Sequence, residues 1–150
     1  MKKIRILLSV LTISLLLTAC APARQEEISK ALGVDLGGAE IVSDHDDHGG
    51  FQGDGTTFTV LTLTEESAGE IEKSAAWSGL PLDETARALL KLTDKFDVPE
   101  IENGRYLLID RQSAELRKEE PDILKRYSFN FTLALFDADA RTLYYCTMDT

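Results

Sequence analysis

The chain has 150 residues, with 16 Lys and Arg against 26 Asp and Glu, which gives a formal net charge of −10. A chain of this length suits one domain, and its 43% apolar content argues against wholesale disorder. The acidity argues against a nucleic-acid partner, because phosphates favour a basic surface.

The N-terminus has the layout of a secretory signal, because a basic stretch at residues 1–5 precedes an apolar run at residues 6–17. That run is too short to span a bilayer as a helix, which takes about 20 residues. The Leu-Thr-Ala-Cys sequence at residues 17–20 resembles the lipobox of bacterial lipoproteins. This resemblance implies that residues 1–19 are a signal peptide and that Cys20 then carries a lipid. Two acyl chains anchor a protein stably to a membrane, whereas one is marginal.

Removal of the signal peptide would leave 13 Lys and Arg against 26 acids, a net charge of −13. Residues 20–29 hold the lipid site and then Ala, Pro and charged residues without an apolar period, which predicts a tether. Residues 30–150 are expected to form a single domain. We expect the chain at the extracytoplasmic face of the cell membrane, or at the outer membrane if its source has two membranes. An ordinary signal peptide followed by a chance cysteine is the alternative.

Cys146 would be the one cysteine left without a lipid, so an internal disulfide is not expected. It lies in a strand-like run at residues 143–148 that has no evident electropositive neighbours. This setting indicates a buried, inert thiol rather than a reactive nucleophile.

The first elements of the expected domain are short. Residues 26–32 can form one or two helical turns that end at Gly33, and residues 39–44 form a weak strand. Residues 56–64 alternate Thr and β-branched residues with apolar ones, which indicates a clearer strand. The glycine-rich loop at residues 45–55 lies between these strands, so we predict a β-hairpin.

Two helices are predicted next. Thr64 can cap the first helix, whose apolar residues recur at helical spacing. Asp83 can cap the second, which is expected to run to about Lys95. A break at residues 79–81 separates the two helices, and a further breaker, Asn103-Gly104, follows them.

Three strands complete the chain. Residues 105–110 are strand-like, and residues 111–122 are polar and indicate a surface excursion. Residues 127–135 alternate apolar and polar side chains, which predicts a strand with one buried face. A turn at residues 137–141 then leads into a returning strand at residues 142–148.

This order of elements predicts the fold class. Hairpins imply antiparallel pairing, and helices grouped between strands imply an α+β fold. We therefore expect a single antiparallel sheet of about five strands, with the two helices packed on one face. The C-terminal hairpin must pair with the rest of the sheet to be stable.

The glycine-rich loop is the strongest candidate for a metal site. It holds both histidines of the chain, His45 and His48, together with Asp46, and Asp44 precedes it. These are metal-ligand types, and flexible glycines let a loop wrap a divalent ion. The loop fails the EF-hand pattern, because Gly55 stands where a bidentate Glu belongs. A purely structural hairpin loop is the alternative, and no other cofactor is expected.

No catalytic signature is present in the sequence. It lacks a Gly-x-Ser-x-Gly elbow and a phosphate-binding loop. The consecutive Ser43, Asp44 and His45 cannot form a triad among themselves, because neighbours on a strand point to opposite faces. We therefore expect no enzymatic activity.

Two aromatic residues are candidates for a binding surface. Trp77 could anchor a partner, although a Trp in this setting more often packs over the edge of a core. Tyr144 and Tyr145 should face opposite sides of a strand, so one of them is expected to point outward. We take Tyr144 as the candidate.

Three stretches of the chain resemble small secreted lipoproteins of clostridial-type bacteria, a family without an assigned activity. They are HGGFQGDG at 48–55, the segment from Trp77 to Leu82, and YSFNFTLALFDADARTLYY at 127–145. The resemblance implies a membrane-anchored extracytoplasmic domain and brings no catalytic or ligand-binding residue with it. The expected function is a non-catalytic binding or accessory module with an unidentified protein partner. The alternative is a divalent-metal-binding lipoprotein that uses residues 44–55.

Overall fold

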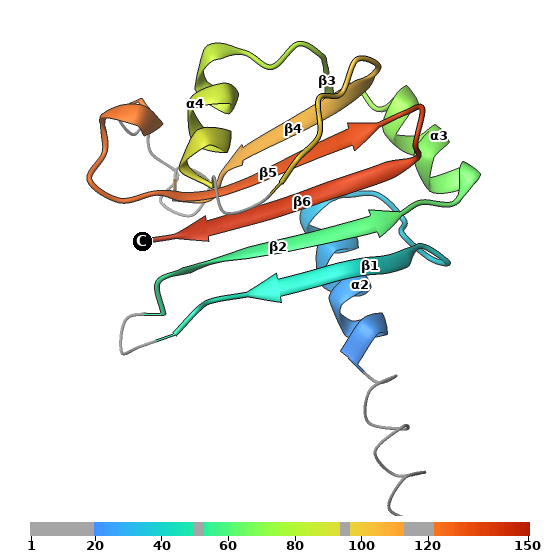
Figure 1. Cartoon of the computed structure of the whole chain (residues 1–150), viewed down its shortest axis with the longest axis horizontal. Helices are drawn as coiled ribbons and strands as arrows, with labels where there is room; N and C mark the ends of the chain where they lie inside the picture. Colours follow the sequence, from blue (N-terminus) through green and yellow to red (C-terminus); the bar gives the residue numbers. More distant parts are fainter. Residues whose placement is uncertain (1–19, 50–52, 94–96, 113–121) are drawn as a thin grey trace, which may run out of the picture.

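The computed structural model describes residues 20–49, 53–93, 97–112 and 122–150. Its strands form one antiparallel sheet in the order β1-β2-β6-β5-β4-β3 (Figure 1). They are β1 (Glu40–Asp46), β2 (Gly55–Thr62), β3 (Ser78–Gly79), β4 (Gly104–Asp110), β5 (Asn130–Asp137) and β6 (Thr142–Asp149). The helices are α2 (Cys20–Leu32), α3 (Glu65–Lys73), α4 (Glu84–Leu92) and the 3-10 turn η1 (Ile123–Lys125). The predicted α+β class with a single antiparallel sheet is confirmed, and the two-residue β3 adds a strand to the expected five.

Both predicted hairpins are present. β1 pairs with β2, and β5 pairs with β6 in continuous register from Asn130↔Asp149 to Asp137↔Thr142. β2 also pairs with β6 along its whole length. The C-terminal hairpin therefore lies in the middle of the sheet, between β2 and β4, where pairing on both sides holds it.

Both predicted helix caps are confirmed. The Thr64 side chain accepts a hydrogen bond from the Ser67 amide, and the Asp83 carboxylate accepts one from the Ala86 amide. Each bond satisfies an amide of a first helical turn that has no partner within its helix. The expected end of the second helix and most of the expected excursion at 111–122 involve residues 94–96 and 113–121, which lie outside the described residues.

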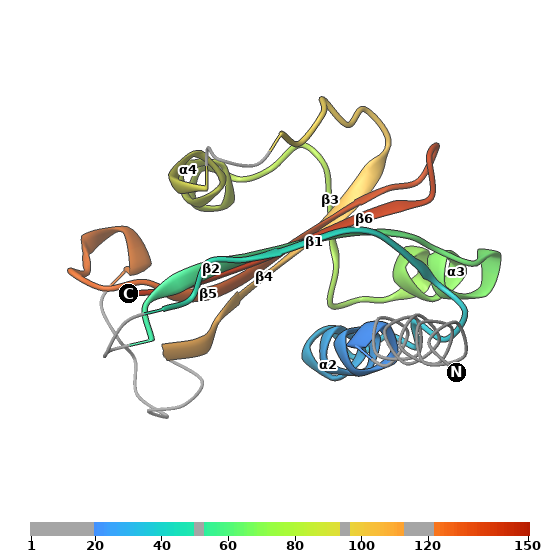
Figure 2. The same ribbon diagram turned by 60° about the horizontal axis from the view of Figure 1, so that its bottom comes forward.

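Helices cover both faces of the sheet (Figure 2). α2 and α3 pack on one face, in a core that includes Ile71 of α3, whereas α4 and η1 pack on the other, in a core that includes Leu89 of α4. The expectation that the helices capped by Thr64 and Asp83 share a face is therefore wrong. Between them the chain forms β3 at the edge of the sheet, beside β4, and it passes from one face to the other there.

The expected tether is also corrected, because residues 20–29 lie in α2. Ile28 is fully buried and Leu32 is 6% exposed, so the last turns of α2 belong to the core. Ala, Gln, Glu and Lys favour helix without an apolar period, which is why the sequence pattern resembles a tether. Gly33, at φ 65°, ends the helix in the left-handed region that glycine tolerates. None of the described helices is long and apolar enough to cross a membrane.

β5 is buried on both faces rather than on one. Every residue from Phe131 to Phe136 is buried, and the side chains alternate between the two helical layers. The strand starts at Asn130, so Tyr127 precedes it and is fully exposed. Period-two alternation indicates which residues share a face, but it does not show what covers each face.

Cys146 is buried, as the sequence predicted, and burial raises the pKa of its thiol to about 12. A thiol that stays protonated is a poor nucleophile. In a Cys20→Ser background we expect no reaction of Cys146 with iodoacetamide in the native protein and full reaction in denaturant, as read by mass spectrometry. Equal labelling rates in the two conditions would contradict this.

Candidate functional site

A cavity lined mainly by polar side chains lies between α2 and the sheet, and we call it the polar cavity. Its volume is about 450 Å³, within the range of ligand-binding pockets. It is lined by Arg24, Glu27, Ala31, Asp46, His48, Thr57, Arg111, Thr132, Tyr145, Thr147 and Asp149. Ten of these eleven side chains carry a polar group, so the cavity differs from the apolar cores around it.

The floor of the polar cavity is a row of three threonines. Thr57 of β2 pairs with Thr147 of β6, which pairs with Thr132 of β5. Because directly paired residues of adjacent strands share a face, the three hydroxyl-bearing side chains stand side by side. Each is nearly inaccessible to solvent, with at most 9% exposed. Farther along the same face, the floor gives way to the apolar residues that pack under α2 and α3, such as Leu143.

Ion pairs form the walls of the polar cavity. The Arg24 guanidinium, on α2, lies 2.8 Å from Glu27 and 3.1 Å from Asp44. The Arg111 guanidinium, just beyond β4, lies 2.8 Å from Asp149. It also donates to the backbone oxygens of β5 and β6, so the sheet fixes its position.

His48 connects the end of the first hairpin to the end of β6. Its Nδ1 lies 2.6 Å from an Asp46 oxygen, and its Nε2 lies 3.2 Å from an Asp149 oxygen. These hydrogen bonds, led by the one to Asp46, raise the pKa of His48. The pKa of Asp46 is lowered in turn, chiefly by the backbone N–H of His48. Both ring nitrogens thus face acceptors, which favours the doubly protonated imidazolium.

We expect the stability of the protein to fall as pH rises past neutrality. A histidine whose pKa is raised by folding contributes stability that is complete below its unfolded pKa of about 6.5 and is lost as pH rises through the folded pKa. Melting temperatures measured from about pH 6 to about pH 8.5 should therefore decline in the wild type, and the decline should flatten in His48→Gln. His45→Gln is the matched control. Equal slopes in wild type and His48→Gln would contradict the assignment.

The four residues of the predicted metal site do not converge. Asp44 and Asp46 point to the α2 face, where both approach Arg24, and His48 lies on that side too. His45 pairs with Phe58 between them, so alternation along β1 places it on the other face. Within the described ranges, which omit residues 50–52, no group of three or more His, Cys, Asp or Glu side chains could hold a metal ion. His45 therefore does not belong to one site with Asp44, Asp46 and His48, which corrects the predicted set of ligands. Metal binding by this region stays a prediction.

The two aromatic candidates have different surroundings. Trp77 is 3% exposed and packs in the core under α2 and α3, so it cannot act as a surface anchor. Tyr144 is half-buried on the α4 face, where it packs against the second core. Its cross-strand neighbour is Leu135, so Tyr144 lies beside a second cavity.

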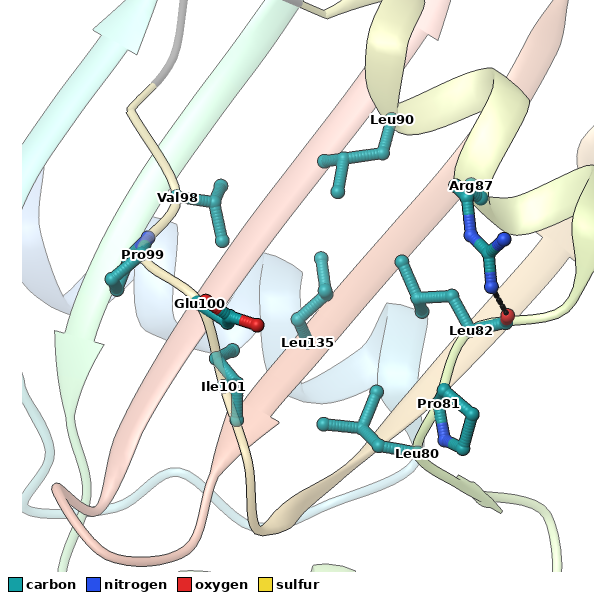
Figure 3. A pocket seen from close by; sticks show the side chains of 10 residues that line it. All are labelled: Leu80, Pro81, Leu82, Arg87, Leu90, Val98, Pro99, Glu100, Ile101 and Leu135. Carbon is teal, nitrogen blue, oxygen red and sulfur yellow. Dashed lines mark hydrogen bonds between the residues drawn. The ribbon is translucent and has the colours of Figure 1, made fainter.

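This second cavity lies on the α4 face and is apolar (Figure 3). Its volume is about 230 Å³, and Leu135 lies at its centre, with Leu90 of α4 above. Figure 3 shows Leu82 and Val98 on opposite sides of it. The Arg87 guanidinium at its rim donates to the Leu82 carbonyl oxygen at 2.9 Å. Few polar groups converge here, so this cavity offers less chemical specificity than the polar cavity.

The sequence analysis missed most of the polar cavity. Its only lining residues among the predicted site residues are Asp46 and His48. The threonines of residues 56–64 and 142–148 were used only as strand indicators, and their shared face depends on pairing between strands far apart in sequence. Comparison with known proteins found no matching family model, no matching curated protein and no matching solved structure.

Proposed function

We propose that this chain is a membrane-anchored extracytoplasmic lipoprotein that acts as a non-catalytic binding module, with the polar cavity as its ligand site. The threonine row is the observation that carries the proposal. The row places hydroxyl groups at the bottom of a cavity with charged walls, whereas the rest of the same sheet face is apolar and packs under α2 and α3. A polar ligand in the cavity is a physical reason for this change of lining.

The arrangement of the charged groups favours binding over catalysis. His48 is held between two carboxylates, and its Nδ1 lies 3.4 Å from the Thr57 hydroxyl but only 2.6 Å from Asp46. An imidazolium in such a clamp is a poor base for activating a hydroxyl. The ion pairs therefore act as fixed hydrogen-bonding walls around a bound molecule.

Lipid attachment at Cys20 is tested by metabolic labelling with a palmitate analogue, followed by membrane fractionation. We expect the wild type to be labelled and to sediment with membranes, and Cys20→Ser to lose both properties. Cys146→Ser is the matched control, since it removes the other cysteine and should stay labelled. Undiminished labelling of Cys20→Ser would overturn the anchor.

Ligand binding in the polar cavity is tested by thermal shift of the full chain against amino acids, saccharides, carboxylates, amines and divalent ions. We expect one class to raise the melting temperature saturably, and Thr147→Val to abolish the rise. Thr56→Val is the control, because Thr56 is on the same strand as Thr57 but faces the α4 side. No shift from any class would count against the proposed site. A metal-specific rise that needs His48 would instead support the metal prediction.

A further inference from the structure

We infer that the polar cavity binds a neutral, hydroxyl-rich ligand of the saccharide class. This inference rests on the proposed function, because it assigns a ligand to the same site. Three features of the described residues carry it: the balance of charge in the walls, the donor and acceptor chemistry of the floor, and the volume.

The charges that line the polar cavity compensate one another. Its cationic groups are Arg24, Arg111 and His48, and its anionic groups are Glu27, Asp46 and Asp149. Each cationic group has a carboxylate of this set within 3.2 Å. An anionic ligand would have to displace these carboxylates, and a cationic ligand would have to displace the guanidiniums or the imidazolium. Either exchange leaves a partly buried charge unpaired, which is costly, so a neutral ligand fits best.

The remaining hydrogen-bonding capacity matches hydroxyl groups. Carboxylates only accept, guanidiniums only donate, and threonine hydroxyls do both. A ligand hydroxyl also donates and accepts, so it can pair with every kind of group in this cavity. A ligand with several hydroxyls on a compact ring could contact Thr147, the most exposed of the three threonines, and both walls together.

The size and lining of the polar cavity agree with such a ligand. A volume of 450 Å³ is the liquid volume of about fifteen water molecules, enough for a small ring with polar substituents. Among the described lining residues, Ala31 is the one wholly apolar side chain, and the Tyr145 side chain is buried. A mainly apolar ligand would therefore find few apolar contacts in a cavity lined by charged and hydroxyl-bearing side chains.

The test is isothermal titration calorimetry on the full chain, purified in a detergent without a sugar headgroup. The probes are galactose and N-acetylglucosamine as neutral sugars, with glucosamine as the cationic and glucuronate as the anionic analogue. We expect saturable binding of at least one neutral sugar and weaker binding of both charged analogues. Thr147→Val keeps the side-chain shape, and it should weaken binding by about tenfold. Thr56→Val should leave binding unchanged.

The outcomes separate this inference from the proposed function. Tighter binding of glucuronate or glucosamine than of neutral sugars would overturn the inference that the ligand is a neutral saccharide. It would leave the proposed ligand site in place. Binding of a non-saccharide class that needs Thr147 would do the same. Absence of binding by every class would overturn both. Vesicles with and without a galactosyl lipid then distinguish the source, since binding to these vesicles but not to free galactose assigns the sugar to a lipid headgroup.

Discussion

Replacement of Phe136 by alanine should destabilise the protein by about 3–5 kcal/mol, as urea denaturation would measure. Phe136 is completely buried in the central strand β5, within the core under α2 and α3. The expected loss has two sources, the transfer free energy of the aromatic ring and the cavity that it leaves. Since single domains are stable by only about 5–15 kcal/mol, this change alone approaches the limit of folding.

Tyr127→Ala is the control for Phe136→Ala. Tyr127 is fully exposed before β5, although the sequence pattern placed it on a buried face. Its replacement should change the free energy of unfolding by no more than about 0.5 kcal/mol. A large effect at Tyr127 together with a small effect at Phe136 would show that the described burial of β5 is wrong.

Gly104→Ala should lower the free energy of unfolding by about 1–3 kcal/mol or more, a loss second only to that expected for Phe136→Ala among these predictions. Gly104 begins β4 and pairs with Asp137, and a β-carbon built on it would collide with the Phe136 carbonyl oxygen. That oxygen belongs to the backbone of a central strand, so it cannot rotate away as a side chain would. We expect a lower midpoint in urea and an unchanged far-ultraviolet circular dichroism spectrum in native buffer.

Gly79→Ala is the matched control for Gly104→Ala. Gly79 lies on the neighbouring strand β3, opposite Arg105, and a β-carbon there meets nothing within 4 Å. Its replacement should leave the free energy of unfolding unchanged or raise it slightly, because alanine reduces the freedom of the unfolded chain. Equal losses at both glycines would mean that general strand propensity, rather than the collision at Phe136, decides the result.

Features that depend on short stretches of chain could be predicted from the sequence. The caps at Thr64 and Asp83 need only a suitable side chain and an amide three residues later. The two hairpins need alternating strands joined by a loop or turn. Asn103-Gly104 illustrates the limit of such rules, because a dipeptide typical of turns here leads directly into β4.

Features that depend on distant pairing could not be predicted. The opposite placement of α3 and α4 depends on the β3–β4 edge contact, which involves only two residue pairs. Helical turns were predicted at residues 26–32, and α2 extends them back to Cys20, where no apolar residue indicates packing. The threonine row needs the register of three strands, and each threonine alone is an ordinary strand residue.

On the proposed acylation of Cys20, α2 sets how far the domain can move from the bilayer. The helix is continuous from Cys20 to Leu32, and Ile28 is locked against the sheet. The helix rises about 12 Å between Cys20 and Ile28. A short rigid helix, rather than a flexible linker, would therefore join the lipid to the sheet. The domain would then stay in a thin layer next to the membrane and move only laterally. Molecules outside that layer would have to diffuse to it.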